Sequence, residues 1–213
     1  MSLIAENVTK RIKGKLILQD ICLKMQTGAV YGFCGRNGSG KTMLFRALSG
    51  LMRIDSGKIC WNGQELHKDF SVLPSLGIVL EHAGLYTNMT GLENLSYLAG
   101  LKGLIGKEEM CEAMKRVGLE PYDKRVYSKY SMGMKQRLAI AQAIMERPEV
   151  IMLDEPTNGL DETGVHEIRT LIGQERERGA LILLASHNRE DINLLADHVY
   201  RIDGGCLTEE EKT

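Results

Sequence analysis

Apolar and polar residues alternate near the start of the chain in the pattern that predicts β-strands. In ICLKM, residues 21–25, the side chains of Ile21, Leu23 and Met25 fall on one face of an extended chain. An unbroken apolar run, AVYGFCG, follows at residues 29–35 and predicts a buried strand that ends in glycine. The beginning of the chain is therefore expected to be rich in strands.

Further along, helix-like and strand-like patterns alternate. KTMLFRALSGLM predicts a helix, KICWNG predicts a short strand, and residues 92–146 are mostly helical in pattern. The last third contains the apolar strands VIMLDEP, ALILLAS and HVYRID, with helices between them. The first of these helices carries Val165, Ile168, Leu171 and Ile172 on one face. Strands joined by helices in this way predict an α/β fold with a mostly parallel sheet, and the helical middle is a candidate inserted subdomain.

Length and charge narrow the class of protein. The chain has 213 residues, the size of one domain with or without an inserted subdomain. Its 27 Lys+Arg and 28 Asp+Glu nearly cancel, so nonspecific binding to nucleic acid is disfavoured. No apolar run approaches the roughly 20 residues of a membrane-spanning helix, and no signal peptide is recognisable, so we expect a cytoplasmic protein. The five cysteines have no metal-ligand spacing and are expected to be reduced core thiols.

The segment GRNGSGKT fits the phosphate-loop pattern G-x-x-x-x-G-K-[ST], and it lies between a predicted strand and a predicted helix. In such a loop the backbone N–H groups surround phosphate oxygens, Lys41 supplies a positive charge, and the hydroxyl of Thr42 is placed to bind Mg²⁺. A glycine-rich turn without a ligand is the alternative, which the Lys-Thr pair disfavours. The residues expected to bind the nucleotide are Gly35, Asn37, Gly38, Ser39, Gly40, Lys41 and Thr42.

Two adjacent carboxylates, Asp154 and Glu155, end the apolar strand that starts at Val150. Parallel α/β sheets bind ligands at the carboxyl ends of their strands. We expect Asp154 to hold Mg²⁺ directly or through water, and Glu155 to polarise an attacking water. An acidic pair that caps the next turn is the alternative, but the phosphate loop earlier in the chain favours the functional interpretation. Just past another strand end, His187 of LLASH could reach a terminal phosphate, although a single histidine is more often an ordinary polar residue.

Together these motifs, in this order, resemble the ATP-binding cassette (ABC) ATPases over essentially the whole chain. YSMGMKQR, residues 130–137, is similar to the signature sequence LSGGQ-Q-Q-R of that family: Ser131 and Gly133 match, while Met132 and Met134 replace a glycine and a glutamine. The resemblance implies that Ser131 and Gly133 complete the nucleotide site of a second subunit. A hydroxyl and free N–H groups at a helix start suit an anion, and a simple N-cap role for Ser131 is compatible with this.

Other roles come only from the resemblance. Asp161, in NGLD, falls where the family has a residue that links the two nucleotide sites of the dimer, and His187 matches its switch histidine. Glu155 and His187 are thus the expected catalytic residues. The fold implied is a single ABC domain over residues 1–213, with an antiparallel β region, a mostly parallel core sheet and a helical subdomain at about 90–146.

Two positions depart from the family's pattern. Ile12 stands where many members have an aromatic residue, so adenine would lack the stacking contribution of about 1–3 kcal/mol. Glu81 stands at a strand end where the family usually has Gln, and we expect it to strengthen a Mg²⁺ held with Thr42. Alternatively, Glu81 points to solvent or toward a basic loop of a permease. Glu81 and the segment that follows it resemble a subgroup for antimicrobial-peptide export and self-protection, which includes lantibiotic immunity transporters.

These residues indicate an ATPase subunit that forms a homodimer around two ATP molecules, with Mg²⁺ as cofactor. Its hydrolysis would drive a separate transmembrane permease, and the subunit would lie on the cytoplasmic face of the membrane as a peripheral protein. A soluble ABC protein that acts on ribosomes, DNA ends or cluster assembly is the main alternative, although those proteins usually have tandem cassettes or a long coiled coil. A nucleotide-gated interaction protein is a third possibility, which Glu155 and His187 disfavour.

Overall fold

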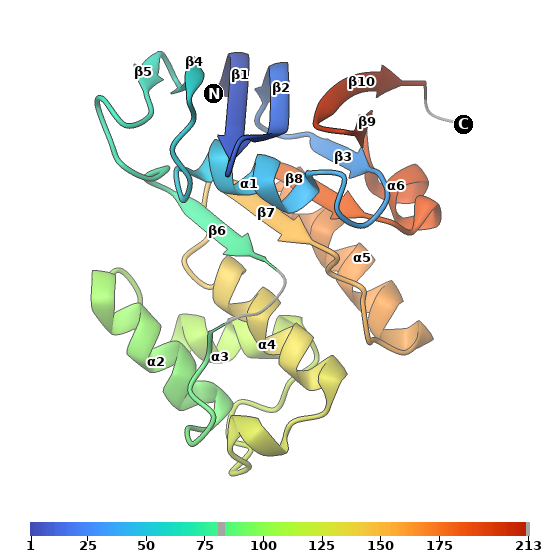
Figure 1. Cartoon of the computed structure of the whole chain (residues 1–213). Coiled ribbons are helices and arrows are strands. Elements are labelled where there is room, and N and C mark those ends of the chain that lie inside the picture. The colour runs from blue at the N-terminus through green and yellow to red at the C-terminus, as the bar shows by residue number, and fades with distance from the viewer. Residues whose placement is uncertain (81–83, 212–213) are drawn as a thin grey trace.

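The computed structural model describes residues 1–80 and 84–211, and a six-stranded sheet lies at its centre (Figure 1). The strand order is β10-β9-β3-β8-β7-β6, with neighbours parallel except for the antiparallel pair β9 and β10. The strands are β3 (Val30–Cys34), β6 (Leu76–Val79), β7 (Val150–Asp154), β8 (Leu181–Ser186), β9 (His198–Asp203) and β10 (Cys206–Glu210). This sheet confirms the mostly parallel α/β core that the apolar runs predict.

A second, antiparallel sheet covers one end of the core, at the top of Figure 1. It has the order β2-β1-β4-β5, formed by β1 (Ser2–Ile12), β2 (Lys15–Gln26), β4 (Ser56–Trp61) and β5 (Gln64–Glu65). Ile21, Leu23 and Met25 of β2 are all buried, as their alternation predicts. The strand-rich start of the chain is therefore confirmed.

The helices fall into two groups. Beside the core strands lie α1 (Lys41–Ser49), α5 (Glu162–Glu177) and α6 (Arg189–Leu195). Below the core in Figure 1 lies the helical layer, which we define as α2 (Gly91–Lys102), α3 (Lys107–Arg116) and α4 (Met132–Ile144). The predicted helical middle is thus interrupted: residues 117–131 are irregular apart from a 3-10 turn, η1, at Tyr127–Lys129. In the part of the chain that the structure describes, no helix combines the length and apolarity that a membrane span requires.

The central strands are buried on both faces, and their alternate residues pack into different hydrophobic clusters. On β7, Val150 and Met152 face the cluster that contains Leu44 of α1, while Ile151 and Leu153 face the cluster that contains Leu138 of α4. Helices α1 and α4 therefore cover opposite faces of the same sheet. Because both faces are covered, the strands read in the sequence as continuous apolar runs.

The acidic end of the chain is partly structured, because β10 extends to Glu210. Glu210 is the last residue of β10, and its carboxylate pairs with Arg201 of β9. The same carboxylate accepts a hydrogen bond of 3.5 Å from the Cys34 thiol. Burial, and then the nearby Glu210 carboxylate, raises the pKa of the Cys34 thiol. All five cysteines are free, but only Cys34 and Cys111 are buried. The prediction of core thiols is therefore wrong for Cys22 and Cys206, which are exposed.

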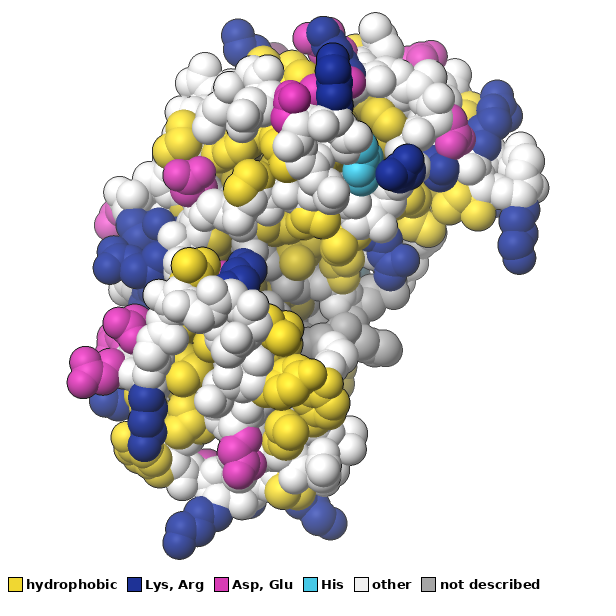
Figure 2. Space-filling model, turned by 90° about the vertical axis from the view of Figure 1, so that its left-hand side faces the viewer, with side chains coloured by type: hydrophobic (Ala, Val, Ile, Leu, Met, Phe, Trp, Pro, Cys, Tyr) yellow, Lys and Arg dark blue, Asp and Glu magenta, His cyan; other side chains and the backbone are white. Residues whose placement is uncertain are grey.

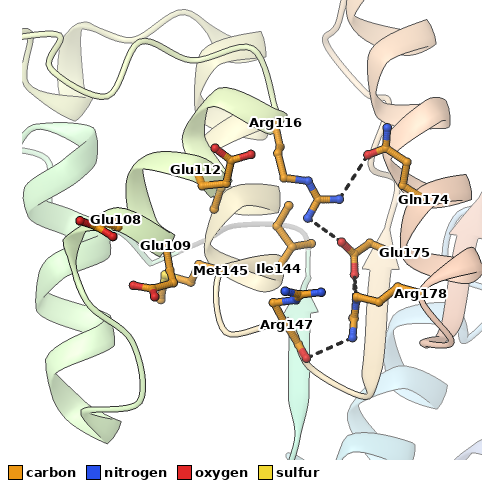
Figure 3. A pocket seen from close by; sticks show the side chains of 11 residues that line it. Glu108, Glu109, Glu112, Arg116, Ile144, Met145, Arg147, Gln174, Glu175 and Arg178 are labelled. Carbon is orange, nitrogen blue, oxygen red and sulfur yellow. Dashed lines mark hydrogen bonds and ion pairs between the residues drawn. The ribbon is translucent and has the colours of Figure 1, made fainter.

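A buried ion-pair cluster joins the helical layer to α5. Glu175 of α5 is 2% exposed and pairs with Arg116 of α3 at 2.7 Å and with Arg178 at 2.6 Å. Figure 3 shows these side chains at one wall of a cavity of about 610 Å³ that lies between α3, the end of α4 and α5. The Arg178 guanidinium also donates to the Pro148 carbonyl at 2.6 Å, so the cluster ties three segments together.

We expect Glu175→Ala to lower the free energy of unfolding by about 1.5–3 kcal/mol, because it removes the buried carboxylate that pairs with two guanidinium groups whose side chains are about one quarter exposed. Urea unfolding should show a lower midpoint at an unchanged slope. Glu6→Ala is the matched control: it breaks the 3.0 Å pair with Lys58, in which both side chains are about half exposed, and should cost less than about 1 kcal/mol. Equal losses in the two variants would contradict a structural role for the Glu175 cluster.

Candidate functional site

The glycine-rich loop between β3 and α1 adopts a conformation that favours glycine at Gly35, Gly38 and Gly40. Gly38 and Gly40 have φ values of 78° and 117°, in the region that side chains disfavour. A Cβ atom added to Gly40 would lie 3.3 Å from the carbonyl oxygen of Ile17 and 3.2 Å from Cδ1 of Ile202. The loop is therefore packed against β9 and the segment of β2 around Ile17.

The side chains of Lys41 and Ser39 lie on the inside of this loop. The Lys41 side chain folds back over the loop, where its Nζ donates to the carbonyl oxygens of Gly35 at 2.7 Å and Arg36 at 3.4 Å. The Ser39 hydroxyl is buried and has no hydrogen-bond partner among the described residues. Buried polar atoms are normally satisfied, so an orphaned hydroxyl and an ammonium group within one loop fit an anionic ligand.

Thr42 and Asp154 meet where α1 begins and β7 ends. The Thr42 hydroxyl donates a short hydrogen bond to Oδ2 of Asp154, a residue that is 4% exposed. A hydroxyl and a carboxylate provide the hard oxygen ligands that Mg²⁺ prefers. The described residues of the site therefore fit this cofactor. Glu81, the third expected ligand, lies outside the described residues.

Glu155 has an unusual backbone conformation, which hydrogen bonds to its N–H and its carbonyl stabilise. Its φ is 52°, a left-handed value that costs a non-glycine residue about 1–3 kcal/mol. Its backbone N–H donates to the Ala185 carbonyl at 2.8 Å, and its own carbonyl accepts from Nε2 of Gln136 in α4 at 3.2 Å. Strain of this kind is common at functional sites.

The side chain of Glu155 is paired with His187. Oε1 of Glu155 accepts from the backbone N–H of His187 at 2.8 Å, and Oε2 lies 2.8 Å from Nδ1 of its ring. Oε2 also accepts from the Ser186 hydroxyl at 3.2 Å. The carboxylate is thus held at the end of β8 in one orientation.

A buried network behind the carboxylates was not visible in the sequence. The Thr157 hydroxyl donates to Asp191 of α6 at 2.6 Å, and Arg169 of α5 donates to the other oxygen of the same carboxylate at 2.8 Å. Asp191 is completely buried, although an acidic residue in a seven-residue helix reads as a surface residue. This network fixes the loop that leaves Glu155. Gln136 was missed as well, because only its long-range contact with Glu155 distinguishes it.

Ser131 and Gly133 lie at the start of α4. The Ser131 hydroxyl caps the helix by accepting from the backbone N–H of Met134 at 3.2 Å. Gly133 packs closely against the next loop: a Cβ atom added to it would lie 3.1 Å from the carbonyl oxygen of Gly159. Asp161 caps α5 in the same way, by accepting from Gly164 N–H at 3.0 Å.

The structure therefore brings the expected residues together in two groups. Gly35 to Thr42, Asp154, Glu155 and His187 gather at the carboxyl edge of the core sheet. Ser131, Gly133 and Asp161 form a neighbouring group at the starts of α4 and α5, and Gln136 connects it to Glu155. Ile12 lies at the end of β1, in the hairpin with β2.

The chain is similar to known proteins over most of its length. Residues 18–158 match the family model described as ABC transporter. The chain is 43% identical over 206 residues to an uncharacterised ABC transporter ATP-binding protein, YybJ, of Bacillus subtilis (strain 168), covering 97% of the chain and 94% of the relative. It is 40% identical to the bacitracin transport ATP-binding protein BcrA of Bacillus licheniformis, covering 96% of the chain and 67% of the relative. It is 32% identical to the lantibiotic transport ATP-binding protein SrtF of Streptococcus pyogenes, covering 97% and 89%.

Solved structures confirm the fold. A dimeric structure of a bacterial ABC transporter cassette superposes with a TM-score of 0.89 at 22% identity, covering 99% of both chains. A post-hydrolysis state of such a cassette, bound to ADP and Pi, gives a TM-score of 0.87 at 21% identity, again covering 99% of both. The match to the family model and the identity to full-length relatives together show that the chain belongs to the ABC transporter family.

Proposed function

We propose that the chain is the ATP-hydrolysing subunit of an ABC transporter and that it drives a separate membrane permease. The observation that carries this proposal is the position of Glu155. Its carboxylate is held by His187 and Ser186 at the same sheet edge where Thr42 meets Asp154. The ATP-binding relatives and the cassette bound to ADP and Pi support the same activity.

The loop would bind the phosphates of ATP. Lys41 and the free N–H groups at the start of α1 would face the phosphate oxygens, and the Ser39 hydroxyl would gain the partner that it lacks. Thr42 and Asp154 would hold Mg²⁺. When bound, the metal neutralises negative charge on the phosphates.

Glu155 would act as the general base. An ionised carboxylate can only accept hydrogen bonds, so the Nδ1 atom of His187, 2.8 Å away, must carry the proton that they share. Together with the His187 N–H and the Ser186 hydroxyl, this proton keeps the carboxylate at a fixed angle. A carboxylate oriented in this way can polarise a water for attack on the terminal phosphate, while His187 is close enough to contact that phosphate.

A second copy of the chain would complete the site. Helix α4 covers the opposite face of the sheet from α1, the helix that follows the chain's own loop. Ser131 and Gly133 lie at the start of α4, where unpaired backbone N–H groups favour an anion. We therefore assign Ser131, Gly133 and Asp161 to the nucleotide of the partner copy, which makes the active form a homodimer.

The permease would bind on the helical layer. Tyr97 and Leu101 lie one turn apart on α2, with exposed fractions of 47% and 70%, and Leu104 follows at 69%. The ring of Tyr86 packs edge-on against Tyr97, with 4.9 Å between centroids. Figure 2 shows apolar side chains exposed on the helical layer from this side. Exposed apolar surface of this kind marks a docking site, and the subunit would accordingly lie against the cytoplasmic face of the membrane.

The names of the relatives indicate the cargo. Two of them are a bacitracin transport protein and a lantibiotic transport protein, and both of those compounds are antimicrobial peptides. We propose export of, or immunity to, a peptide of this class. The permease would recognise that peptide, while the subunit described here supplies the energy.

Lys41→Ala and Ser131→Arg should separate binding from turnover. The first removes the charged donor of the phosphate loop, worth about 1.5–3 kcal/mol, and should raise the Kd for a fluorescent ATP analogue roughly tenfold to hundredfold. The second places a bulky side chain at the partner's phosphate, so binding by the monomer should stay near that of the wild type while ATPase activity is lost. Equal loss of binding in both variants would show that Ser131 belongs to the nucleotide site of its own chain.

Glu155→Gln should trap the dimer. Glutamine keeps the shape of the side chain but cannot act as a base, which typically costs a factor of about 10²–10⁴ in rate, so bound ATP persists. Light scattering of this variant should show twice the monomer mass with Mg-ATP and the monomer mass without it. Lys41→Ala under the same conditions is the control and should remain a monomer. A monomer mass for Glu155→Gln with saturating Mg-ATP would contradict the shared site.

Leu101→Glu should uncouple the subunit from its permease. A carboxylate on the exposed apolar face should weaken docking, so less permease should co-purify from detergent-solubilised membranes of cells that express both proteins. ATPase activity of the isolated subunit should be unchanged. Leu194→Glu, at an exposed leucine of α6, is the matched control and should leave co-purification intact. Normal co-purification of Leu101→Glu would place the permease elsewhere.

A further inference from the structure

Met132 is the most exposed methionine of the chain. All eleven methionines lie in the described residues, and nine of them are buried or half-buried. The remaining two are Met1 at the chain start, 60% exposed, and Met132, 69% exposed. Met132 is the first residue of α4 and lies between Ser131 and Gly133. An apolar thioether is therefore open to solvent inside the proposed shared site.

The exposed side chain is not loose, because it lies over the loop between β7 and α5. A Cβ atom added to Gly159 would lie 2.8 Å from Cγ, 2.9 Å from Sδ and 3.0 Å from Cε of Met132. Gly159 has a φ of 74°, a value that favours glycine. Because glycine has no Cβ atom, the Met132 side chain has room to lie against it. The thioether thus bridges the start of α4 and the loop that leads to Asp161.

The backbone beside the sulfur contains free donors. The N–H of Met134 is used by the Ser131 hydroxyl, whereas the first N–H groups of a helix have no partner within the helix. In the proposed function these donors, at Met132 and Gly133, face the terminal phosphate bound by the partner copy. A new acceptor on the Met132 side chain would compete with that phosphate.

We propose that Met132 is an oxidation site through which peroxides switch off ATP hydrolysis, an inference that rests on the proposed function. The sulfur gives up two electrons to hydrogen peroxide and takes one oxygen atom, which yields methionine sulfoxide and one water. The sulfoxide oxygen is a strong hydrogen-bond acceptor with partial negative charge. It competes for the free N–H groups of α4, repels the approaching phosphate and disrupts the apolar contact with Gly159.

Lys41 bonds within its own loop, and the helix that follows this loop, α1, covers the opposite face of the sheet from α4, so oxidation of Met132 leaves the phosphate loop unaffected. Oxidation therefore spares ATP binding by the monomer and blocks closure of the dimer. Closure in turn buries Met132 against the partner, so bound Mg-ATP protects the sulfur from peroxide. Exposure governs methionine oxidation, which makes this protection measurable without any activity assay.

The test treats the purified full-length chain with hydrogen peroxide and follows each methionine by peptide mass spectrometry. Met132 should gain oxygen before the nine buried or half-buried methionines. The Glu155→Gln variant saturated with Mg-ATP should be oxidised at Met132 several times more slowly than the same variant without nucleotide. Oxidation of Met132 no faster than that of Met134, its half-buried neighbour, would overturn the proposal.

Activity is then compared for each protein with its own untreated sample. Oxidised wild type should lose about tenfold in turnover, equivalent to about 1.4 kcal/mol, while its Kd for ATP changes less than about twofold. Met132→Leu, similar in volume but without sulfur, should keep its activity after peroxide, and the matched Met134→Leu should lose it like the wild type. Methionine sulfoxide reductase should restore the oxidised wild type, an arm that holds even if Met132→Leu is inactive.

Two results separate a failure of the oxidation switch from a failure of the proposed ATPase function. Unchanged turnover after complete oxidation of Met132 would overturn the switch while leaving the ATPase assignment intact. Absence of ATPase activity in the untreated chain, with or without its permease, would instead overturn the proposed function.

Discussion

Hydrogen bonds to Glu155 join parts of the structure that are far apart in the sequence. Its backbone N–H continues the ladder with β8, its carbonyl accepts from Gln136 of α4, and its carboxylate is held by His187 and Ser186. These contacts offset the cost of a left-handed φ at a residue that is not glycine. The helical layer, through the backbone carbonyl, and the core, through the backbone N–H and the carboxylate, are thus both connected to the same residue.

Local chemistry explains what could be predicted from the sequence. The phosphate loop was recognisable because left-handed glycines, a lysine and a threonine must occur at fixed spacing. Strands β3, β7 and β8 were recognisable because burial on both faces leaves unbroken apolar runs. The resemblance drawn from YSMGMKQR and the carboxylate pair was confirmed at the level of the family.

Interactions between distant residues explain what could not be predicted. Gln136 and Asp191 look like ordinary polar residues of helices, and only the folded chain shows one against Glu155 and the other buried with Thr157 and Arg169. The pair between Glu210 and Arg201 likewise joins two neighbouring strands, and only the folded chain shows it. The roles of Ile12 and Glu81 stay predictions, since they concern contacts with a nucleotide and a metal.

The placement of α1 and α4 on opposite faces of one sheet has a consequence for stoichiometry. In the proposed dimer, each copy supplies a loop to one site and a helix start to the other, so the interface is isologous and related by a two-fold axis. Such a pairing uses the same surface on both copies and closes on itself, which leaves no complementary surface for a third. The assembly would therefore stop at two copies and could not extend into a filament. A mixed pair with one defective helix start would contain one complete and one incomplete site.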